Sequence, residues 1–197
     1  MPAPTNMSDA IDEIKATGLP VFLSTPDIDV VFQTRIKEFK SDALVLENTV
    51  PHSYISALVG AVRYHIQAQL IRLEAENIES DGVNIVFPLA NLDVKEDNRE
   101  AKRVFFDQSD DVFLEVINPF DQETLIRKPI IDISNTGISI KSPIKSNLYH
   151  PGTHFKDMKI LVNGELYNQT SGHVVYHRRF LDLNGKSYYQ IGFRFDS

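Results

Sequence analysis

The chain is dominated by runs in which apolar and polar residues alternate, the period expected of β-strands with one buried face. The clearest run covers residues 62–70, where apolar positions alternate with Arg63, His65, Gln67 and Gln69. Further strands are predicted over Val30–Ile36, Ala43–Leu46, Val83–Phe87, Val112–Ile117, Leu125–Ile131, Gly137–Ile140, Met158–Val162, Gly172–Tyr176 and Tyr188–Phe195. The sequence therefore predicts an all-β protein.

Helical patterning is confined to the first half of the chain. Ser8 is a suitable N-cap and Gly18 a suitable C-terminal residue for a short helix over Asp9–Thr17, with two isoleucines on its buried side. Residues 51–59 fit either a short helix or a loop, and the pattern does not decide between them.

Turn signals divide the predicted strands. Asn163-Gly164 and Asn184-Gly185 are typical of tight hairpin turns. Short strands joined in this way favour an antiparallel barrel or sandwich. The polar stretch at residues 91–98 is interpreted as a linker, so we expect two small antiparallel β-barrel domains, over residues 1–97 and 98–197.

Composition narrows the range of partners. The 197 residues are 42% hydrophobic, which is ordinary for folded protein, and the net charge is −7. Residues 1–97 hold 7 Lys/Arg against 15 Asp/Glu, whereas residues 98–197 hold 13 against 12. Because the acidic half repels nucleic acid and anionic membranes, we expect neither as a partner.

The residue types and segments that the sequence lacks exclude further kinds of site and classes of protein. The chain has no Cys, which excludes disulfides, thiolate metal sites and a cysteine nucleophile. No segment approaches the roughly 18 apolar residues of a membrane span, and the N-terminus does not have the pattern of a signal peptide. We therefore expect a cytoplasmic protein without membrane insertion.

Two short motifs stand near the middle of the chain. Residues 99–103 form an RxxxR, and residues 132–137 form a DxSxxG about thirty residues later. Together, in this order and ahead of short strands, they resemble the PilZ family, whose members are bacterial receptors for cyclic di-GMP. The resemblance covers residues 98–197 and implies a six-stranded barrel. It implies a cyclic di-GMP site formed by Arg99, Arg103, Asp132, Ser134 and Gly137.

The side chains of these motifs suit such a ligand. Arginine binds guanine O6 and N7, or a phosphate, through two parallel hydrogen bonds, and on an extended segment Arg99 and Arg103 would lie about 13 Å apart. The Asp132 carboxylate can accept from guanine N1–H and N2–H₂. Ser134 offers a small hydroxyl, and Gly137 allows a positive φ or a close backbone approach.

The first half resembles, more loosely, the N-terminal barrel of YcgR-type flagellar-brake proteins. In that architecture the RxxxR lies between two barrels, and the ligand changes their relative orientation. The resemblance implies a non-catalytic receptor without a cofactor. It would signal to a protein partner such as flagellar motor, pilus or polysaccharide machinery, in motility, biofilm or surface behaviour. The alternative is a degenerate PilZ protein that binds no nucleotide and acts as an interaction module.

The sequence departs from the family pattern in three places. Asn98 stands where many relatives have a further arginine, and Thr136 stands where glycine is common. The C-terminal helix of many relatives is also expected to be missing. Loss of one cation is expected to weaken binding.

Other chemistry finds less support in the sequence. His150/His154 and His173/His177 have the HxxxH spacing, but a strand would place the second pair about 13 Å apart, so no metal site is expected. No P-loop, G-x-S-x-G or G-x-G-x-x-G is present, and no enzyme is expected, although a carboxylate pair stays open. The adjacent Arg178 and Arg179 could instead dock a partner or an anion.

Overall fold

The computed structural model describes residues 7–17, 20–68, 71–96, 103–106 and 110–196. The chain folds into two compact units. Unit 1 comprises Met1–Asn98 together with Phe180–Ser187, and unit 2 comprises Arg99–Arg179 together with Tyr188–Ser197. The domain boundary expected between residues 97 and 98 stays a prediction.

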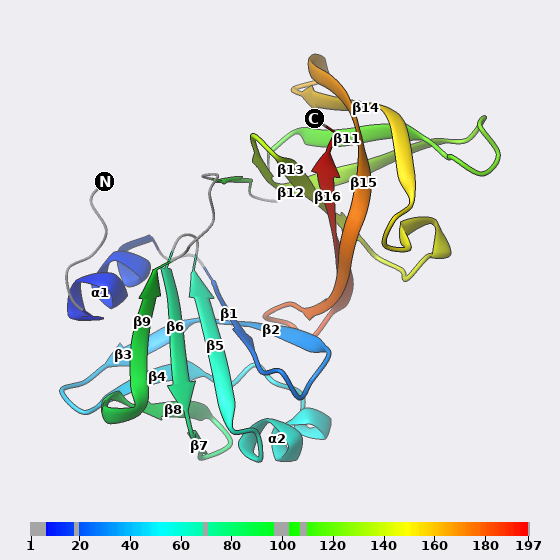
Figure 1. Ribbon diagram of the computed structural model, residues 1–197. Coiled ribbons are helices and arrows are strands. Elements are labelled where there is room, and N and C mark those ends of the chain that lie inside the picture. The colour runs from blue at the N-terminus through cyan, green and yellow to red at the C-terminus, as the bar shows by residue number, and fades with distance from the viewer. Residues whose placement is uncertain (1–6, 18–19, 69–70, 97–102, 107–109, 197) are drawn as a thin grey trace. The chain divides into compact units, whose positions relative to one another are not determined.

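Unit 1 consists of two antiparallel sheets and two helices around one hydrophobic core. The first sheet has the order β2-β1-β5-β6-β9 and the second the order β3-β4-β8-β7 (Figure 1). The elements are α1 (Met7–Thr17), β1 (Val21–Ser24), β2 (Val30–Thr34), β3 (Ile36–Phe39), β4 (Ala43–Glu47), α2 (His52–Val59), β5 (Arg63–Ala68), β6 (Ile71–Glu76), β7 (Glu79–Ser80), β8 (Asn84–Pro88), the short 3₁₀ helix η1 (Leu89–Asn91) and β9 (Leu92–Glu96). Both sheets and both helices contribute side chains to the core.

The two helices refine the sequence predictions. Helix α1 begins at Met7, so Ser8 lies in its first turn and is not the N-cap, while Gly18 lies outside the described residues. The undecided segment at residues 51–59 forms helix α2. Its end is held by the buried Tyr64, whose hydroxyl donates to the carbonyl of Leu58 at 2.6 Å. The Leu58 carbonyl also accepts from the Ala61 N–H at 3.2 Å, so the Tyr64 hydroxyl is a second donor at this helix end.

The alternating run at residues 62–70 contains β5, in which Tyr64 and Ile66 are fully buried. The linker predicted at residues 91–98 is wrong over most of its length, because Leu92–Glu96 form β9 and pair with β6. Leu92 is buried and Val94 packs against the core, while the charged Asp93 and Lys95 are exposed. Two apolar residues among charges gave too weak a pattern to predict this strand.

Unit 2 is a closed six-stranded barrel, as the resemblance implied. Its ring follows the order β14-β11-β12-β13-β16-β15 and closes by pairing of β15 with β14 (Figure 1). The elements are β10 (Val104–Phe105), β11 (Val112–Ile117), β12 (Leu125–Ser134), β13 (Gly137–Ser142), the 3₁₀ helix η2 (Asn147–Tyr149), β14 (His154–Val162), β15 (Glu165–Leu181) and β16 (Ser187–Phe195). The all-β prediction is confirmed.

The strands β14 and β15 are longer than their predicted cores. Strand β15 has 17 residues, and its predicted part covered Gly172–Tyr176 only. The strand extends beyond the predicted part at both ends, and at residues 165–169 the side chains are exposed and the buried alternation disappears. The turn before β15 is tight because Asn163 and Gly164 have φ of 53° and 80°, the left-handed pair that a two-residue hairpin favours.

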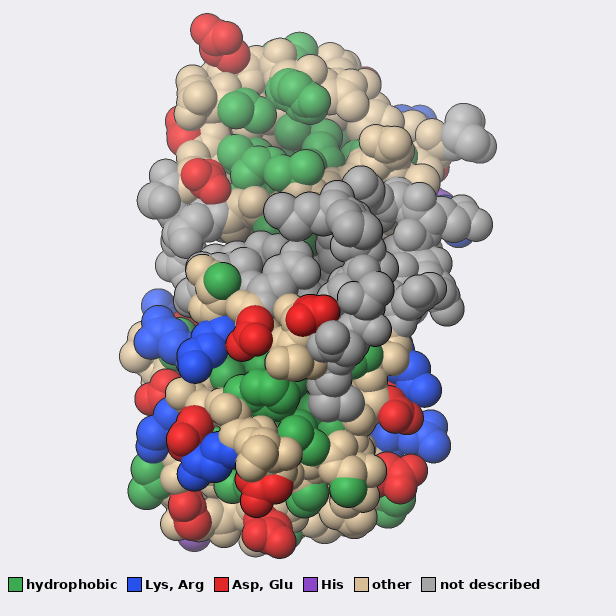
Figure 2. Space-filling model, turned by 90° about the vertical axis from the view of Figure 1, so that its left-hand side faces the viewer, with side chains coloured by type: hydrophobic (Ala, Val, Ile, Leu, Met, Phe, Trp, Pro, Cys, Tyr) green, Lys and Arg blue, Asp and Glu red, His purple; other side chains and the backbone are tan. Residues whose placement is uncertain are grey.

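Charged side chains on unit 1 are mixed in sign. In Figure 2 the basic and acidic groups of this unit are interspersed on the face shown. Several are paired locally, such as Lys40 with Glu38 at 3.2 Å and Arg72 with Glu74 at 2.9 Å. Within the described residues, no helix is both long and apolar enough to cross a membrane.

Candidate functional site

The two sequence motifs meet in unit 2. Strand β10 pairs antiparallel with β12, with Phe105 opposite Asp132, and this places Arg103 at the start of β10 beside that carboxylate. Arg103 Nη1 lies 2.7 Å from Asp132 Oδ1, although 29 residues separate the two in the chain. One arginine of the RxxxR and the aspartate of the DxSxxG therefore form a charge-assisted hydrogen bond.

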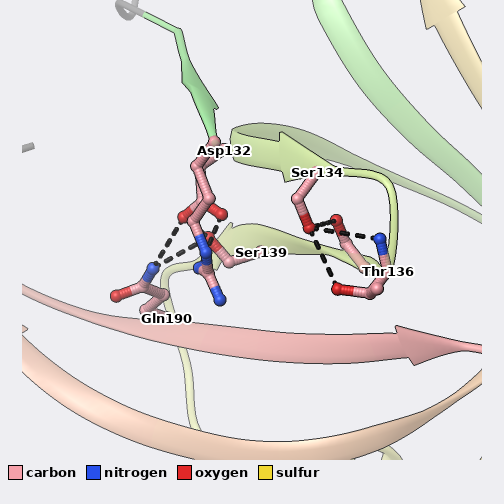
Figure 3. A network of polar contacts seen from close by, with 7 residues as sticks. Asp132, Ser134, Thr136, Ser139 and Gln190 are labelled. Atoms are coloured by element: carbon pink, nitrogen blue, oxygen red, sulfur yellow. Dashed lines mark hydrogen bonds and ion pairs between the residues drawn. The ribbon is translucent and has the colours of Figure 1, made fainter. Parts of the chain in front are cut away.

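Asp132 is a buried charged residue with several donors. Its side chain is 2% exposed. Ser139 Oγ on β13 donates to Asp132 Oδ2, and Gln190 Nε2 on β16 lies 3.3 Å from the same oxygen. Gln190 Nε2 also donates to Ser139 Oγ at 2.8 Å, so the three side chains form one connected network (Figure 3). A buried carboxylate is tolerated when it is paired and hydrogen-bonded in this way.

Arg103 is held on a second side by Tyr176 of β15. Burial disfavours the charged guanidinium, but the negative charge of Asp132 and the contact with Tyr176 outweigh it and raise the pKa of Arg103. The Tyr176 ring packs against Gly192 of β16, where an added Cβ would lie 2.2 Å from ring atom Cε1. Only glycine at position 192 leaves room for the ring in this place.

Ser134 and Gly137 shape the hairpin between β12 and β13. They face each other in the strand register, and Ser134 Oγ lies 3.3 Å from both the Gly137 carbonyl oxygen and the Thr136 nitrogen (Figure 3). A Cβ at Gly137 would lie 2.1 Å from the Phe193 carbonyl oxygen, so glycine serves a close backbone approach at this position. Among the described residues, the hydrogen bonds of Ser134 stay within its own turn.

The structure places some of the predicted site residues and leaves others outside the part of the chain that it describes. Arg103 and Asp132 are in contact, and Ser134 and Gly137 form the adjacent turn. Arg99 lies outside the described residues, as does Asn98, so their parts in the site stay predictions.

Sequence reasoning missed three side chains that complete this network, namely Ser139, Tyr176 and Gln190. Ser139 gave a faint signal, as a single hydroxyl between two isoleucines in a buried strand. Gln190 gave none, because it approaches Ser139 only through the pairing of β13 with β16. These two are diagonal cross-strand neighbours, since Ser139 pairs with Gly192 two residues along.

Of the two histidine pairs, His150 directly follows the 3₁₀ helix η2, and the other three histidines lie in strands of the barrel. His173 and His177 both lie in β15, as the strand prediction required. His154 of β14 faces His173 across the ladder, and their rings lie 2.7 Å and 3.5 Å from carboxylate oxygens of Asp196. Hydrogen bonds from Ser171 and His154 lower the pKa of Asp196 to about 2. No three His, Asp or Glu of the described part of the chain are placed to hold a metal ion.

A separate hollow of about 310 Å³ lies on the second sheet of unit 1. Its basic side chains already have partners, since Lys37 Nζ lies 2.8 Å from Asn84 Oδ1 and Lys40 pairs with Glu38. None of the predicted site residues lines this hollow.

Comparison with known proteins found likeness at the level of structure. No protein-family model matches the sequence, and no curated protein sequence matches it. MrkH of K. pneumonia in complex with c-di-GMP is 14% identical with a TM-score of 0.66, covering 98% of this chain and 87% of that one. A second MrkH structure, described as a novel c-di-GMP-dependent transcription regulatory factor, gives a TM-score of 0.69 at 14% identity over 98% and 84%.

YcgR of Escherichia coli in complex with c-di-GMP has a TM-score of 0.57 at 14% identity, covering 98% of this chain and 83% of that one. At such identity the likeness establishes the fold. The fold that the sequence resemblance implied is therefore confirmed along nearly the whole chain, which shares the fold of the MrkH and YcgR structures.

Proposed function

We propose that this chain is a non-catalytic receptor for cyclic di-GMP. The observation that carries the proposal is the contact of Arg103 with Asp132. The fold joins two motifs from distant parts of the sequence into one polar cluster, which the family resemblance assigns to this ligand. The solved structures of MrkH and YcgR, which share the fold at TM-scores of 0.66 and 0.57, are described as complexes with c-di-GMP, and this supports the assignment.

Arg103 is suited to bind an anion while staying paired. A guanidinium has five N–H donors, and Asp132 Oδ1 lies against Nη1. The donors that neither Asp132 nor Tyr176 engages can meet a phosphate, or O6 and N7 of guanine, with the planar geometry that suits both groups. The pairing with Asp132 reduces the rotamer freedom that Arg103 has to lose on binding.

In this proposal Arg99 supplies the second cation of the clamp, while Ser134 and Gly137 shape the floor of the site. The bound ligand changes the arrangement of the two units, since a ligand shifts a conformational equilibrium by its differential affinity for the states. The output is a signal to a protein partner in the cytoplasm, in the control of motility or surface behaviour. Small-angle scattering with and without cyclic di-GMP tests this step, and identical curves at saturation would contradict it.

Calorimetric titration with cyclic di-GMP, with GTP as the control ligand, tests the receptor function. We expect saturable binding of cyclic di-GMP alone at micromolar or lower dissociation constant. Arg103→Ala and Arg99→Ala are each expected to abolish binding, and the melting curve of each variant shows whether it is folded.

A matched control is available on the same barrel. Arg127 contacts Phe113, Asp111 and Glu115 on β11 or just before it, and none of these is a predicted site residue. Arg127→Ala removes the same charge and should bind normally. If the wild-type protein binds no cyclic di-GMP, the receptor proposal fails, and the alternative of a nucleotide-independent interaction module takes its place.

A further inference from the structure

Asp132 has little capacity left to read a guanine. A carboxylate offers about four lone pairs. Oδ1 accepts from Arg103, and Oδ2 accepts from both Ser139 and Gln190. One acceptor position on Oδ1 is therefore open, whereas the N1–H and N2–H₂ edge of guanine presents adjacent donors.

Asp132 is also poorly placed to meet a ligand. Its side chain is 2% exposed, and the side chain of Arg103, which is 27% exposed, lies against it. A ligand that used both oxygens of Asp132 would have to displace Arg103 and Gln190 and leave their polar groups unpaired. Such groups cost free energy when they are buried without partners.

Gln190 lies beside Asp132 and has a hydrogen-bond acceptor, the amide oxygen Oε1, that is available to a ligand. The orientation of its amide follows from its neighbours, because the carboxylate can only accept and Ser139 already donates its O–H to that carboxylate. The NH₂ group therefore faces Asp132 and Ser139, and the amide oxygen Oε1 points away from them (Figure 3). Among the described residues, Oε1 has no hydrogen-bond donor, and the side chain is half-buried.

We propose that Gln190 determines base specificity at this site, with Oε1 accepting from the N1–H and N2–H₂ edge of a guanine. Asp132 is then a positioning residue, which holds Arg103 through Oδ1 and orients the Gln190 amide through Oδ2. This inference rests on the proposed function, because it assigns a role within the cyclic di-GMP site.

The choice of base follows from the chemistry of the acceptor. Guanine directs donors at Oε1, whereas adenine carries an acceptor at N1 and has no 2-amino group. An amide oxygen held by its own NH₂ group favours guanine and repels adenine N1. The ratio of the dissociation constants for cyclic di-AMP and cyclic di-GMP is therefore the quantity that Gln190 sets.

The test measures both dissociation constants by competition against a fluorescent cyclic di-GMP derivative, for the wild type, Gln190→Met and Asp132→Asn. We expect Gln190→Met to weaken cyclic di-GMP binding by about tenfold or more, with cyclic di-AMP changed less than about threefold. Asp132→Asn is expected to weaken both ligands by a similar factor, since it loosens Arg103. It should leave the ratio nearly unchanged, because Ser139 Oγ still accepts from the Gln190 NH₂ group and keeps the amide in its orientation.

Gln169→Met serves as the control. Gln169 is an exposed glutamine of β15 whose amide donates to Asp157 at 3.3 Å, so the same substitution is made beside another aspartate. It should leave both constants unchanged.

The inference is overturned if Gln190→Met keeps the wild-type ratio of the two dissociation constants. It is overturned most directly if Asp132→Asn abolishes that ratio while Gln190→Met keeps it, because Asp132 would then read the base. Should Gln190→Met fail to fold, as circular dichroism would show, Gln190→Ala provides the second variant. It also removes the acceptor, so the ratio should be lost, and a ratio like that of the wild type would refute the role. No binding of cyclic di-GMP to the wild type would instead refute the proposed function itself.

Discussion

Arg103 Nη1 and Asp132 Oδ1 lie 2.7 Å apart in a part of the barrel where the carboxylate is nearly inaccessible to water. Antiparallel pairing of β10 with β12 brings the two side chains together, so an arginine near the start of unit 2 contacts an aspartate near the end of β12. The free-energy cost of burying the Asp132 carboxylate depends on its pairing with Arg103, and this dependence can be measured.

Removal of the arginine is expected to destabilise the protein more than removal of both charges. Arg103→Ala leaves the Asp132 carboxylate buried without its cation, which we expect to cost about 3 kcal/mol of unfolding free energy. The double variant Arg103→Ala/Asp132→Asn should recover part of that loss, because no unpaired charge is left. Urea denaturation of the two variants and of Asp132→Asn gives the coupling energy, and strictly additive effects would contradict the buried pair.

Gly137→Ala is expected to destabilise unit 2. An added methyl group would lie 2.1 Å from the Phe193 carbonyl oxygen, and main chain in a paired strand cannot move aside easily. Overpacking of this kind costs about 1–3 kcal/mol. Gly60→Ala is the control, since Gly60 has right-handed helical angles and its nearest neighbour is 3.3 Å away. Thermal melting should show a clear loss for Gly137→Ala and little change for Gly60→Ala.

Tyr149→Phe is expected to raise stability in alkaline solution. Burial raises the pKa of Tyr149 to about 12, and among the described residues its buried hydroxyl has no hydrogen-bond partner. The unfolded chain loses this proton near its ordinary pKa of about 10, so the wild type loses stability between about pH 10 and 12. The phenylalanine variant has no hydroxyl to ionise and should not show this loss of stability.

Denaturation profiles of wild type and Tyr149→Phe across pH 8–12 check the expectation. The exposed Tyr167 provides the control variant Tyr167→Phe, which should keep the wild-type slope. Parallel profiles for wild type and Tyr149→Phe would show that the Tyr149 hydroxyl ionises normally.

Asp196→Asn is expected to remove a pH-dependent contribution to folding stability in acidic solution. Hydrogen bonds from Ser171 and His154 lower the pKa of Asp196 to about 2, below its unfolded value of 3.8. A carboxyl with a lowered pKa stabilises the folded state above its unfolded pKa, and this contribution is lost as the pH falls through the folded value. The difference in melting temperature between wild type and Asp196→Asn should therefore shrink from pH 4 to pH 2. A constant difference over that range would refute the assignment.

Several elements were predictable because their physics is local. The β5 pattern, the last strand and the Asn163-Gly164 turn follow from side-chain alternation and from backbone preferences of single residues. Strand β9 was not predictable, because it is recognisable only once β6 is beside it. Asp93 and Lys95 are exposed in the sheet, but in the sequence this charged stretch is indistinguishable from a linker.

The sequence by itself determined an all-β chain, its main strands, and two motifs that pointed to a PilZ-type barrel and to Arg103 and Asp132. Only the tertiary structure decided which groups surround that aspartate. Gln190 lies 58 residues from Asp132 in the chain and reaches it through the pairing of β13 with β16. Strand alternation is set by neighbouring residues, whereas the partners of a buried carboxylate are set by the closure of the barrel, which brings distant strands together.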